Sequence, residues 1–395
     1  MTGSLSAKVL DLEESATLRL TQRARTMREA GIDIVALTAG EPDFATPAHV
    51  KEAARRAIDG DFTHYTANQG TPELIAAVIE KFRSENGLHY APAEVLVSTG
   101  AKQSLFNALT AMLNPGDEVV IPAPYWVSYP AIVRLAGGVP VIVPPSDGFR
   151  LDAGGIRTAL TQRTRALIIN TPCNPTGTVC TEGELGAIAS LALEAGITVV
   201  SDEIYETMVF DGRVHASIGA RPGMLPHVVT VNGVSKSYAM TGWRIGFMGG
   251  PEPVIALAAR VQGQVTNNAN SIAQKATVAA LQGPRAPIEA MRDEFQRRRD
   301  FVARRFASGG VPQPAPEGAM FFLIDCARWI GRSARGRALS TAADIVEHLL
   351  EHHHVALVPG EAFGAPHHMR MSFAAPMEEL DRGVERILRG LGELE

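Results

Sequence analysis

The stretch of residues 228–244 reads Val-Val-Thr-Val-Asn-Gly-Val-Ser-Lys-Ser-Tyr-Ala-Met-Thr-Gly-Trp-Arg, and its two cations are Lys236 and Arg244. The apolar run 228–231 predicts a strand, and the Asn-Gly pair after it predicts the loop that ends the strand. Lys236 would then lie just beyond the carboxyl end of a strand, where open α/β sheets bind their ligands. A lysine can form a Schiff base with an aldehyde cofactor, and an arginine can bind a phosphate. The stretch therefore predicts a ligand site at the mouth of a sheet.

Short apolar runs recur along the middle of the chain, and most are separated by segments long enough for a helix. We expect strands at 95–98, 118–121, 140–143, 166–169, 198–200, 228–231 and 245–248. We expect helices between them at 101–113, 125–136 and 182–195. This alternation is typical of an α/β fold with a mostly parallel, seven-stranded sheet sandwiched by helices.

The pattern changes past about residue 283, where charged helical segments alternate with short strands. We expect helices at 289–307, 342–351 and 377–391, and strands at 320–324, 355–358 and 369–373. An N-terminal helix at 17–30 is expected to join them. The chain is thus predicted to form a large domain over residues 46–284 and a smaller α+β domain from residues 1–45 and 285–395.

The composition is ordinary for a soluble enzyme, with 46% hydrophobic and 20% charged residues in a chain of 395. The formal net charge is −5 and no basic tract occurs, which argues against nucleic acid or an anionic membrane as a partner. No apolar stretch approaches the ~18 residues that span a bilayer, and the N-terminus lacks the apolar core of a signal peptide. We therefore expect a cytoplasmic protein.

Nucleotide and metal sites have little support in the sequence. No G-x-G-x-x-G opens the first strand–helix unit and no G-x-x-x-x-G-K-[ST] occurs. The sequence therefore lacks the usual motifs of dinucleotide-binding and P-loop sites. His352, His353 and His354 form a run, and His367 and His368 form a pair. We interpret the run as a polar helix end and the pair as a surface loop, and expect no metal.

Three polar side chains follow predicted strands. Asn174 lies in an Asn-Pro-Thr-Gly turn after the strand at 166–169, where it can donate to a cofactor oxygen. Asp202 comes directly after the apolar run 197–200, and a carboxylate there is costly to bury unless it is paired. A protonated pyridine nitrogen would suit it, and a helix cap is the alternative. Tyr205 is expected beside Asp202 on a beginning helical turn.

Further candidates surround the same predicted sheet edge. The backbone N–H groups of Gly100, Ala101 and Lys102 open a predicted helix and suit a phosphate. Trp126 follows another strand and could stack on a flat cofactor ring, although a tryptophan of the core is an equal interpretation. Arg370 lies in an apolar strand, where its guanidinium group needs an anion such as a substrate carboxylate.

Together these motifs resemble the class I/II aminotransferases, which are pyridoxal-phosphate enzymes of fold type I, and most closely the bacterial aspartate aminotransferase branch. The matches run nearly end to end, from Ala-Gly-Glu-Pro-Asp-Phe at 39–44 through Tyr65 to Arg370. The order of Asn-Pro-Thr-Gly, Ser-Asp-Glu-Ile-Tyr and the block 236–246 is highly specific.

The resemblance implies that Lys236 binds pyridoxal 5′-phosphate covalently and then moves the substrate proton. Asp202 would pair with the pyridinium nitrogen, and Tyr205 and Asn174 with the phenolic oxygen. Arg244 would hold the phosphate together with the backbone of residues 100–102.

The resemblance also implies how the site is completed. Trp126 would cover the ring of the cofactor. Arg370, with Gly40 nearby, would bind the substrate α-carboxylate. Tyr65 would reach the phosphate of a neighbouring subunit, which implies a homodimer with shared active sites.

Substrate choice rests on fewer residues. Lys102 and Thr17 stand where the aspartate branch reads a distal carboxylate, and Glu13 stands where members that accept prephenate tend to carry a lysine. We expect a ping-pong exchange between aspartate and 2-oxoglutarate, and disfavour prephenate. An aminotransferase for an aromatic or neutral amino acid, a fold-type I lyase and a non-enzymatic regulator that senses the cofactor are the alternatives. Gly233 departs from the family pattern, as does Thr-Asn-Asn-Ala at 266–269.

Overall fold

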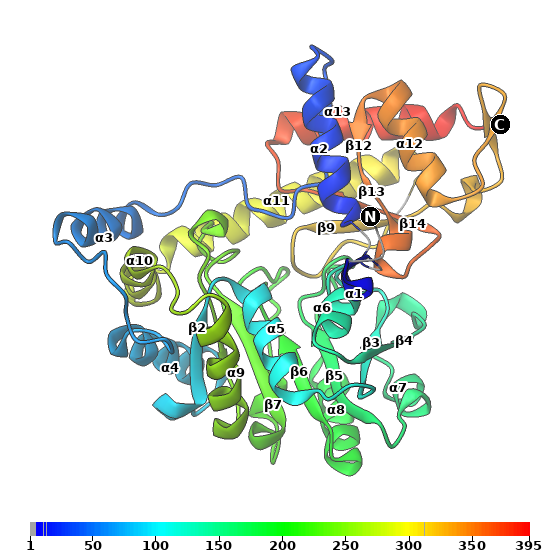
Figure 1. The fold of residues 1–395 in the computed structure, drawn as a ribbon. Helices are drawn as coiled ribbons and strands as arrows, with labels where there is room; N and C mark the ends of the chain where they lie inside the picture. Colours follow the sequence, from blue (N-terminus) through cyan, green and yellow to red (C-terminus); the bar gives the residue numbers. More distant parts are fainter. Residues whose placement is uncertain (1–4, 11, 13, 312) are drawn as a thin grey trace.

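The computed structural model describes residues 5–10, 12, 14–311 and 313–395. Its largest sheet has seven strands in the order β2-β8-β7-β6-β5-β3-β4 (Figure 1). The strands are β2 (Val95–Ser98), β3 (Glu118–Pro122), β4 (Val139–Val143), β5 (Thr164–Asn170), β6 (Thr198–Asp202), β7 (Val228–Gly233) and β8 (Gly246–Gly249). β8 runs antiparallel to both of its neighbours, whereas the other pairs are parallel. The predicted α/β fold with a mostly parallel sheet is confirmed, with small shifts at the strand ends.

Helices cover both faces of this sheet because successive residues of a strand point to opposite faces. Ala166 and Ile168 of β5 share a core cluster with α5 (Ala101–Met112), α6 (Tyr129–Leu135) and α9 (Glu252–Val265). Leu167 and Ile169 pack on the other face with α7 (Ala153–Ala159) and α8 (Glu182–Ala195). Three further helices pack beside β2: α3 (Ala48–Asp59), α4 (Pro72–Asn86) and α10 (Ser271–Gln282).

A second group of elements lies above the seven-stranded sheet in Figure 1. Its centre is an antiparallel sheet in the order β13-β14-β9, made of β13 (Val358–Pro359), β14 (His368–Ser372) and β9 (Phe321–Asp325). Around it pack α2 (Ala16–Glu29), α11 (Ala286–Ser308), α12 (Ala342–His353) and α13 (Met377–Gly392). The shorter elements are α1 (Ala7–Leu10), the parallel pair β1 (Val35–Ala36) and β12 (Val355–Ala356), and the hairpin of β10 (Ser333–Ala334) and β11 (Arg337–Ala338).

Two helical expectations near the sheet edge are wrong. The helix expected at 125–136 begins only at Tyr129, because the N–H of Tyr125 bonds to Phe363 O at 3.0 Å and draws the preceding residues into a loop. Tyr205 stands in a turn rather than on a helix, since the N–H of Met208 bonds to Tyr205 O at 2.8 Å and the chain does not continue as a helix.

Two expectations in the C-terminal part also need correction. The strand expected at 355–358 is two short strands, β12 and β13, which belong to different sheets. His368 is the first residue of β14 rather than part of a surface loop, because it pairs with Asp325 of β9. Along the part of the chain that the structure describes, no helix combines the length and the apolar character needed to cross a bilayer.

Candidate active site

A cavity of about 360 Å³ opens at the carboxyl ends of β5, β6 and β7, below the three-stranded sheet. It brings together most of the residues predicted from the sequence, which are Gly40, Ala101, Lys102, Trp126, Asn174, Asp202, Tyr205, Lys236, Arg244 and Arg370. Gly100 lies at its edge, in contact with Arg244. Tyr65 does not line the cavity, and its side chain is 87% exposed.

Lys236 lies just beyond the carboxyl end of β7, as predicted, and its Nζ donates to the carbonyl oxygen of Gly40. Burial lowers the pKa of this amine to about 8, with Arg244 and Arg370 acting in the same direction and Glu41 and Asp202 opposing them. A substantial fraction of the amine is therefore neutral near pH 8, which a nucleophile or a base requires.

Asp202 is the last residue of β6 and is buried. Its Oδ2 accepts a hydrogen bond from the hydroxyl of Tyr129 at 2.7 Å, and its Oδ1 accepts one from the N–H of Ile204 at 3.3 Å. Burial raises the pKa of this carboxyl group to about 6, while these hydrogen bonds oppose the shift. Tyr129 is a site residue that the sequence analysis missed; its signal was its place in the first turn of a helix that follows Trp126.

A phosphate-sized anion would meet a concentrated set of donors at the start of α5. Gly100 precedes that helix with φ of 86°, a left-handed conformation, and a Cβ there would lie 2.4 Å from Arg244 Nη2. Only glycine permits both the conformation and this close approach. The guanidinium group of Arg244 is held by a hydrogen bond to Thr241 O at 2.9 Å. The N–H of Gly100 donates to Ser98 O at 2.8 Å, so the N–H groups of Ala101 and Lys102 and the guanidinium group are the donors that favour a phosphate here.

Arg370 is the buried cation of β14. Its Nη1 donates to Asn174 Oδ1 at 3.0 Å and its Nη2 to Thr38 O at 2.8 Å, while its Nε has no hydrogen-bond partner among the described residues. Burial lowers its pKa to about 10, so the group remains charged at neutral pH. The guanidinium carbon Cζ lies 4.4 Å from the ring centroid of Phe321 and 4.8 Å from that of Phe363. A buried cation with an unused donor is suited to the carboxylate of a ligand.

The other walls combine aromatic and polar side chains. Trp126 packs edge-on against Tyr129, with 5.4 Å between ring centroids, and Lys102 Nζ lies 4.8 Å from the Trp126 ring. Burial, and to a lesser extent Arg244, lowers the pKa of Lys102. Thr17 lines the same cavity, and its hydroxyl is buried without a partner in the described part of the chain. Besides Lys236, Arg244 and Arg370, the cavity is thus lined by a fourth cation, Lys102, that can contact a ligand.

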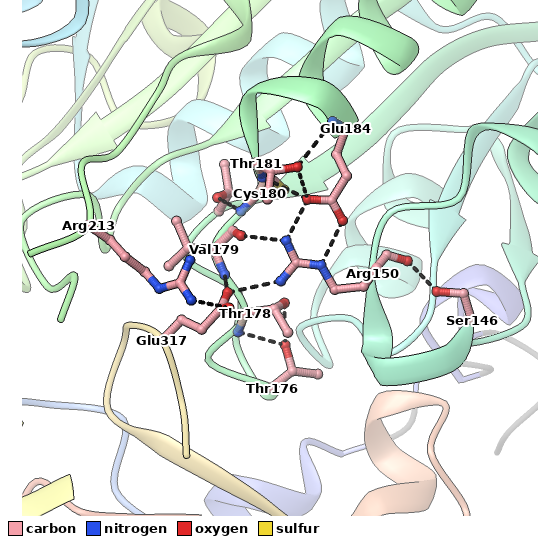
Figure 2. A network of polar contacts seen from close by, with 11 residues as sticks. Ser146, Arg150, Thr176, Thr178, Val179, Cys180, Thr181, Glu184, Arg213 and Glu317 are labelled. Carbon is pink, nitrogen blue, oxygen red and sulfur yellow. Dashed lines mark hydrogen bonds and ion pairs between the residues drawn. The ribbon is translucent and has the colours of Figure 1, made fainter. Parts of the chain in front are cut away.

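The loop that carries Asn174 is held against the segment leading into β9 (Figure 2). Arg150 lies between two carboxylates, with Nη2 2.5 Å from Glu184 Oε2 and Nη1 2.9 Å from Glu317 Oε2. Glu317 also accepts the N–H of Val179 at 2.9 Å and pairs with Arg213 at 2.9 Å. The network therefore ties the loop after β5 to the strand that borders Arg370.

The departures noted in the sequence have local explanations. Gly233 ends β7 where a Cβ would lie 2.9 Å from Ile245 O, so a larger residue would press on the neighbouring strand. Ser235 lines the cavity two positions later. Thr266 accepts a hydrogen bond from Gln103 Nε2 at 2.5 Å, which ties the unusual segment 266–269 to α5.

Known proteins are similar to this chain in both sequence and fold. The profile of the class I and II aminotransferase family matches residues 32–387. The chain is 43% identical to aspartate aminotransferase of Geobacillus stearothermophilus over 98% of both chains, and 46% identical to aspartate/prephenate aminotransferase of Cereibacter sphaeroides over 97% of both. The solved aspartate aminotransferase from Rhizobium meliloti superposes with a TM-score of 0.96 at 42% identity, covering 99% of this chain and 100% of that one. The enzyme from Thermus thermophilus with maleate gives 0.93 at 45%, covering 98% and 99%.

The chain therefore belongs to the class I and II aminotransferases. It is an aminotransferase that depends on pyridoxal phosphate. The side chains present fit this cofactor: an amine of lowered pKa at Lys236, a carboxyl group at Asp202, and the close pair of Gly100 and Arg244 at a helix start. The resemblance inferred from the sequence is confirmed.

Proposed function

We propose that the enzyme transfers the amino group of aspartate to 2-oxoglutarate. The observation that carries this proposal is that Arg370 and Lys102 line one cavity from different elements, in addition to Lys236 and Arg244, which have other proposed roles. Both proposed substrates are dicarboxylates, so each needs an anchor for its α-carboxylate and another for its distal carboxylate. Arg370 is the proposed first anchor, and Lys102 with the unpartnered hydroxyl of Thr17 is the proposed second.

The reaction needs a proton to leave and re-enter the substrate. Pyridoxal phosphate, when bound, supplies an aldehyde for the amino group and a ring that takes up the charge left by the α-proton. Lys236 is the proposed base at the α-carbon, because its lowered pKa leaves neutral amine at physiological pH. Asp202 is proposed to keep a proton on the ring nitrogen, with its carboxyl group oriented by Tyr129.

The remaining roles follow from the contacts. Arg244 and the backbone of residues 100–102 are proposed to hold the phosphate, and Trp126 to cover the ring. Asn174 Oδ1 accepts a hydrogen bond from Arg370, so the N–H₂ group of the Asn174 amide is left to donate. We propose that it donates to the phenolic oxygen of the cofactor, beside Tyr205, the other proposed donor. Gly40, whose carbonyl meets Lys236, is proposed to border the substrate α-carboxylate.

A homodimer with shared active sites is part of the proposal. Tyr65 is 87% exposed and stands outside the cavity of its own chain, which suits a side chain that serves a neighbouring subunit. We also propose the division into a large domain, 46–284, and a small domain, 1–45 with 285–395, and a cytoplasmic location without nucleic acid or membrane partners.

A panel of donors and acceptors tests the substrate assignment. We expect aspartate to give the highest kcat/KM with 2-oxoglutarate, above alanine, phenylalanine and tyrosine. Prephenate belongs in the panel as an acceptor because the relative from Cereibacter sphaeroides is named for it. Glu13, which led us to disfavour prephenate, lies outside the described residues. A higher kcat/KM for a neutral or aromatic donor would contradict the proposal.

A further inference from the structure

A second cluster of chemically reactive side chains lies outside the catalytic cavity, where α12 meets the end of α13. His348 and His353 belong to α12, and Glu393 follows α13. One potential ligand atom of each lies within 4.8 Å of the others. His353 Nε2 and Glu393 Oε2 are 3.3 Å apart.

Both imidazole rings are buried with a polar atom unused. His348 is 6% exposed, and the side chain of His353 is also 6% exposed. The Nε2 atoms of both histidines have no hydrogen-bond partner in the part of the chain that the structure describes. Their ring centroids are 5.2 Å apart. Buried polar atoms are normally hydrogen-bonded. The Nε2 of His348 has no such partner among the described residues, and the 3.3 Å ion-pair contact of His353 Nε2 with Glu393 lacks hydrogen-bond geometry, which together indicate a missing ligand.

The backbone holds this arrangement in place. A Cβ on Gly390 would lie 2.4 Å from Leu349 and 2.8 Å from His353 Cδ2, so a glycine is needed for α13 to approach α12 this closely. The residues after α13 are fixed by paired backbone hydrogen bonds between Glu395 and Ser333 at 2.9 and 3.0 Å. Glu393 is therefore on an ordered segment, while its half-exposed side chain is free to adjust.

We propose that His348, His353 and Glu393 bind one divalent transition-metal ion of the zinc class. Two imidazoles and a carboxylate suit such an ion, with a fourth position for water. Ligand atoms about 2.1 Å from a tetrahedral ion stand about 3.4 Å from one another, which the His353–Glu393 distance already matches. The other separations are at most 4.8 Å, so the side chains would have to bring these atoms closer by up to about 1.4 Å.

A second cluster of similar composition differs from this one because its carboxylates already have partners. Glu203, Glu206 and His215 also converge, but Lys81 Nζ already pairs with Glu206 there. Glu203 in addition accepts hydrogen bonds from Ser201, Ser217 and Asn86. That cluster has its cation and its donors, whereas Glu393 pairs with no lysine or arginine within the part of the chain that the structure describes.

The ion would join α12 to α13, and α12 packs on β13 and on β14, the strand of Arg370. Its role would therefore be to stabilise the part of the fold around the three-stranded sheet. The charges near the site are those of His352, Arg335 and Arg389, besides Glu393 itself. Arg389 is paired with Glu385 at 2.8 Å, so protonated His352 and Arg335 are the main repulsive groups.

The test uses the holoenzyme, stripped with a chelator and titrated with zinc chloride and cobalt chloride. We expect one zinc per chain by elemental analysis, a rise in Tm on adding zinc, and the visible d–d bands of cobalt in a low-coordinate nitrogen and oxygen site. Loss of an outer partner of a metal site costs about 10–100-fold in affinity, so His353→Gln and Glu393→Gln should each weaken zinc binding by at least about 100-fold.

Matched variants decide the outcome. His89→Gln, at an exposed histidine outside α12 and α13, should leave zinc affinity unchanged, and Arg335→Gln should strengthen it. Glu393→Gln is the deciding variant if the histidine variant does not fold, since its side chain is half exposed. The proposal is overturned if no stoichiometric zinc binds, or if binding survives Glu393→Gln unchanged. Because these experiments measure metal affinity and spectra, their outcome does not depend on whether aspartate is the substrate.

Discussion

Tyr129 donates its hydroxyl to Asp202 Oδ2 at 2.7 Å, so the first residue of α6 holds the last residue of β6. Both side chains are buried, and a buried carboxyl group needs donors to remain ionised. The N–H of Ile204 supplies a second, longer hydrogen bond. Tyr129 thus lowers the pKa of Asp202 against the larger effect of burial and fixes the orientation of the carboxyl group.

Tyr129→Phe should reduce kcat/KM for aspartate by about 10–100-fold, because a hydrogen bond to a charged group is worth about 1.5–3 kcal/mol. Without its donor the pKa of Asp202 rises, so the acidic limb of the kcat/KM profile should move to higher pH. Tyr90→Phe is the control, since it removes another buried hydroxyl, which contacts Thr230 at 3.2 Å. An unchanged acidic limb in Tyr129→Phe would contradict the positioning role.

The lowered pKa of Lys236 predicts how the apoprotein captures its cofactor. The neutral fraction of an amine rises about tenfold per pH unit below its pKa and levels off above it. The rate of covalent capture of pyridoxal phosphate should therefore rise with pH up to about 8 and then flatten. Stopped-flow absorbance measures this rate. Borohydride reduction should label the peptide of Lys236, and Lys236→Ala should show neither capture nor label; a label on another lysine would refute the assignment.

The network around Glu317 should matter for both stability and substrate binding. Glu317→Gln weakens the pairs with Arg150 and Arg213 and the acceptor for the N–H of Val179, at an expected cost of about 1–2 kcal/mol in the free energy of unfolding. KM for aspartate should rise, because the loop that carries Asn174 is less firmly held. Urea unfolding and steady-state kinetics provide the two measurements.

The control for that experiment is Glu194→Gln, which breaks an exposed pair with Arg157 far from the loop after β5. Exposed pairs contribute little, so neither the urea midpoint nor KM should change. Equal effects of the two substitutions would mean that the network of Glu317 has no special role.

Mixed dimers test whether Tyr65 serves the neighbouring subunit. Co-expression of Tyr65→Ala with Arg370→Ala should give a heterodimer in which one site carries both lesions and the other carries neither. We expect each homodimer to be nearly inactive and the purified heterodimer to recover up to about half of the wild-type activity, since one site in two is intact. Differently tagged chains allow the heterodimer to be isolated. A heterodimer as inactive as its parents would contradict shared sites.

The seven-stranded sheet was predictable because each strand is an apolar run bounded by loop residues, as at 228–231 and 198–200. Lys236, Asp202 and Asn174 were predictable as neighbours because parallel strands end at the same edge of a sheet. The contact of Tyr129 with Asp202 was not, since the two residues are 73 positions apart and local pattern carries no information on such pairing.

Other features depend on tertiary contacts in the same way. The shortened helix at Tyr129 follows from a backbone hydrogen bond to Phe363, far along the chain. The cluster of His348, His353 and Glu393 forms only where α13 meets α12 at Gly390, so the run of histidines alone indicated no more than a polar helix end.

Lys102 is the residue on which the aspartate assignment depends most. It lies 4.8 Å above the Trp126 ring and lines the same cavity as Arg370, but a lysine there could serve only to offset the charge of a phosphate. If Lys102 binds the distal carboxylate, Lys102→Ala should lower kcat/KM for aspartate roughly 10–100-fold, which corresponds to about 1.5–3 kcal/mol of transition-state stabilisation. The kcat/KM for alanine or phenylalanine should stay nearly unchanged. Steady-state kinetics with the three donors against 2-oxoglutarate measures the difference.

Lys275→Ala is the control, because Lys275 is a lysine outside the cavity that pairs with Glu73 and should affect no donor. An equal loss for acidic and neutral donors would show that Lys102 does not discriminate between them, and the second carboxylate would then have to be read by Thr17 or by a residue of the neighbouring subunit.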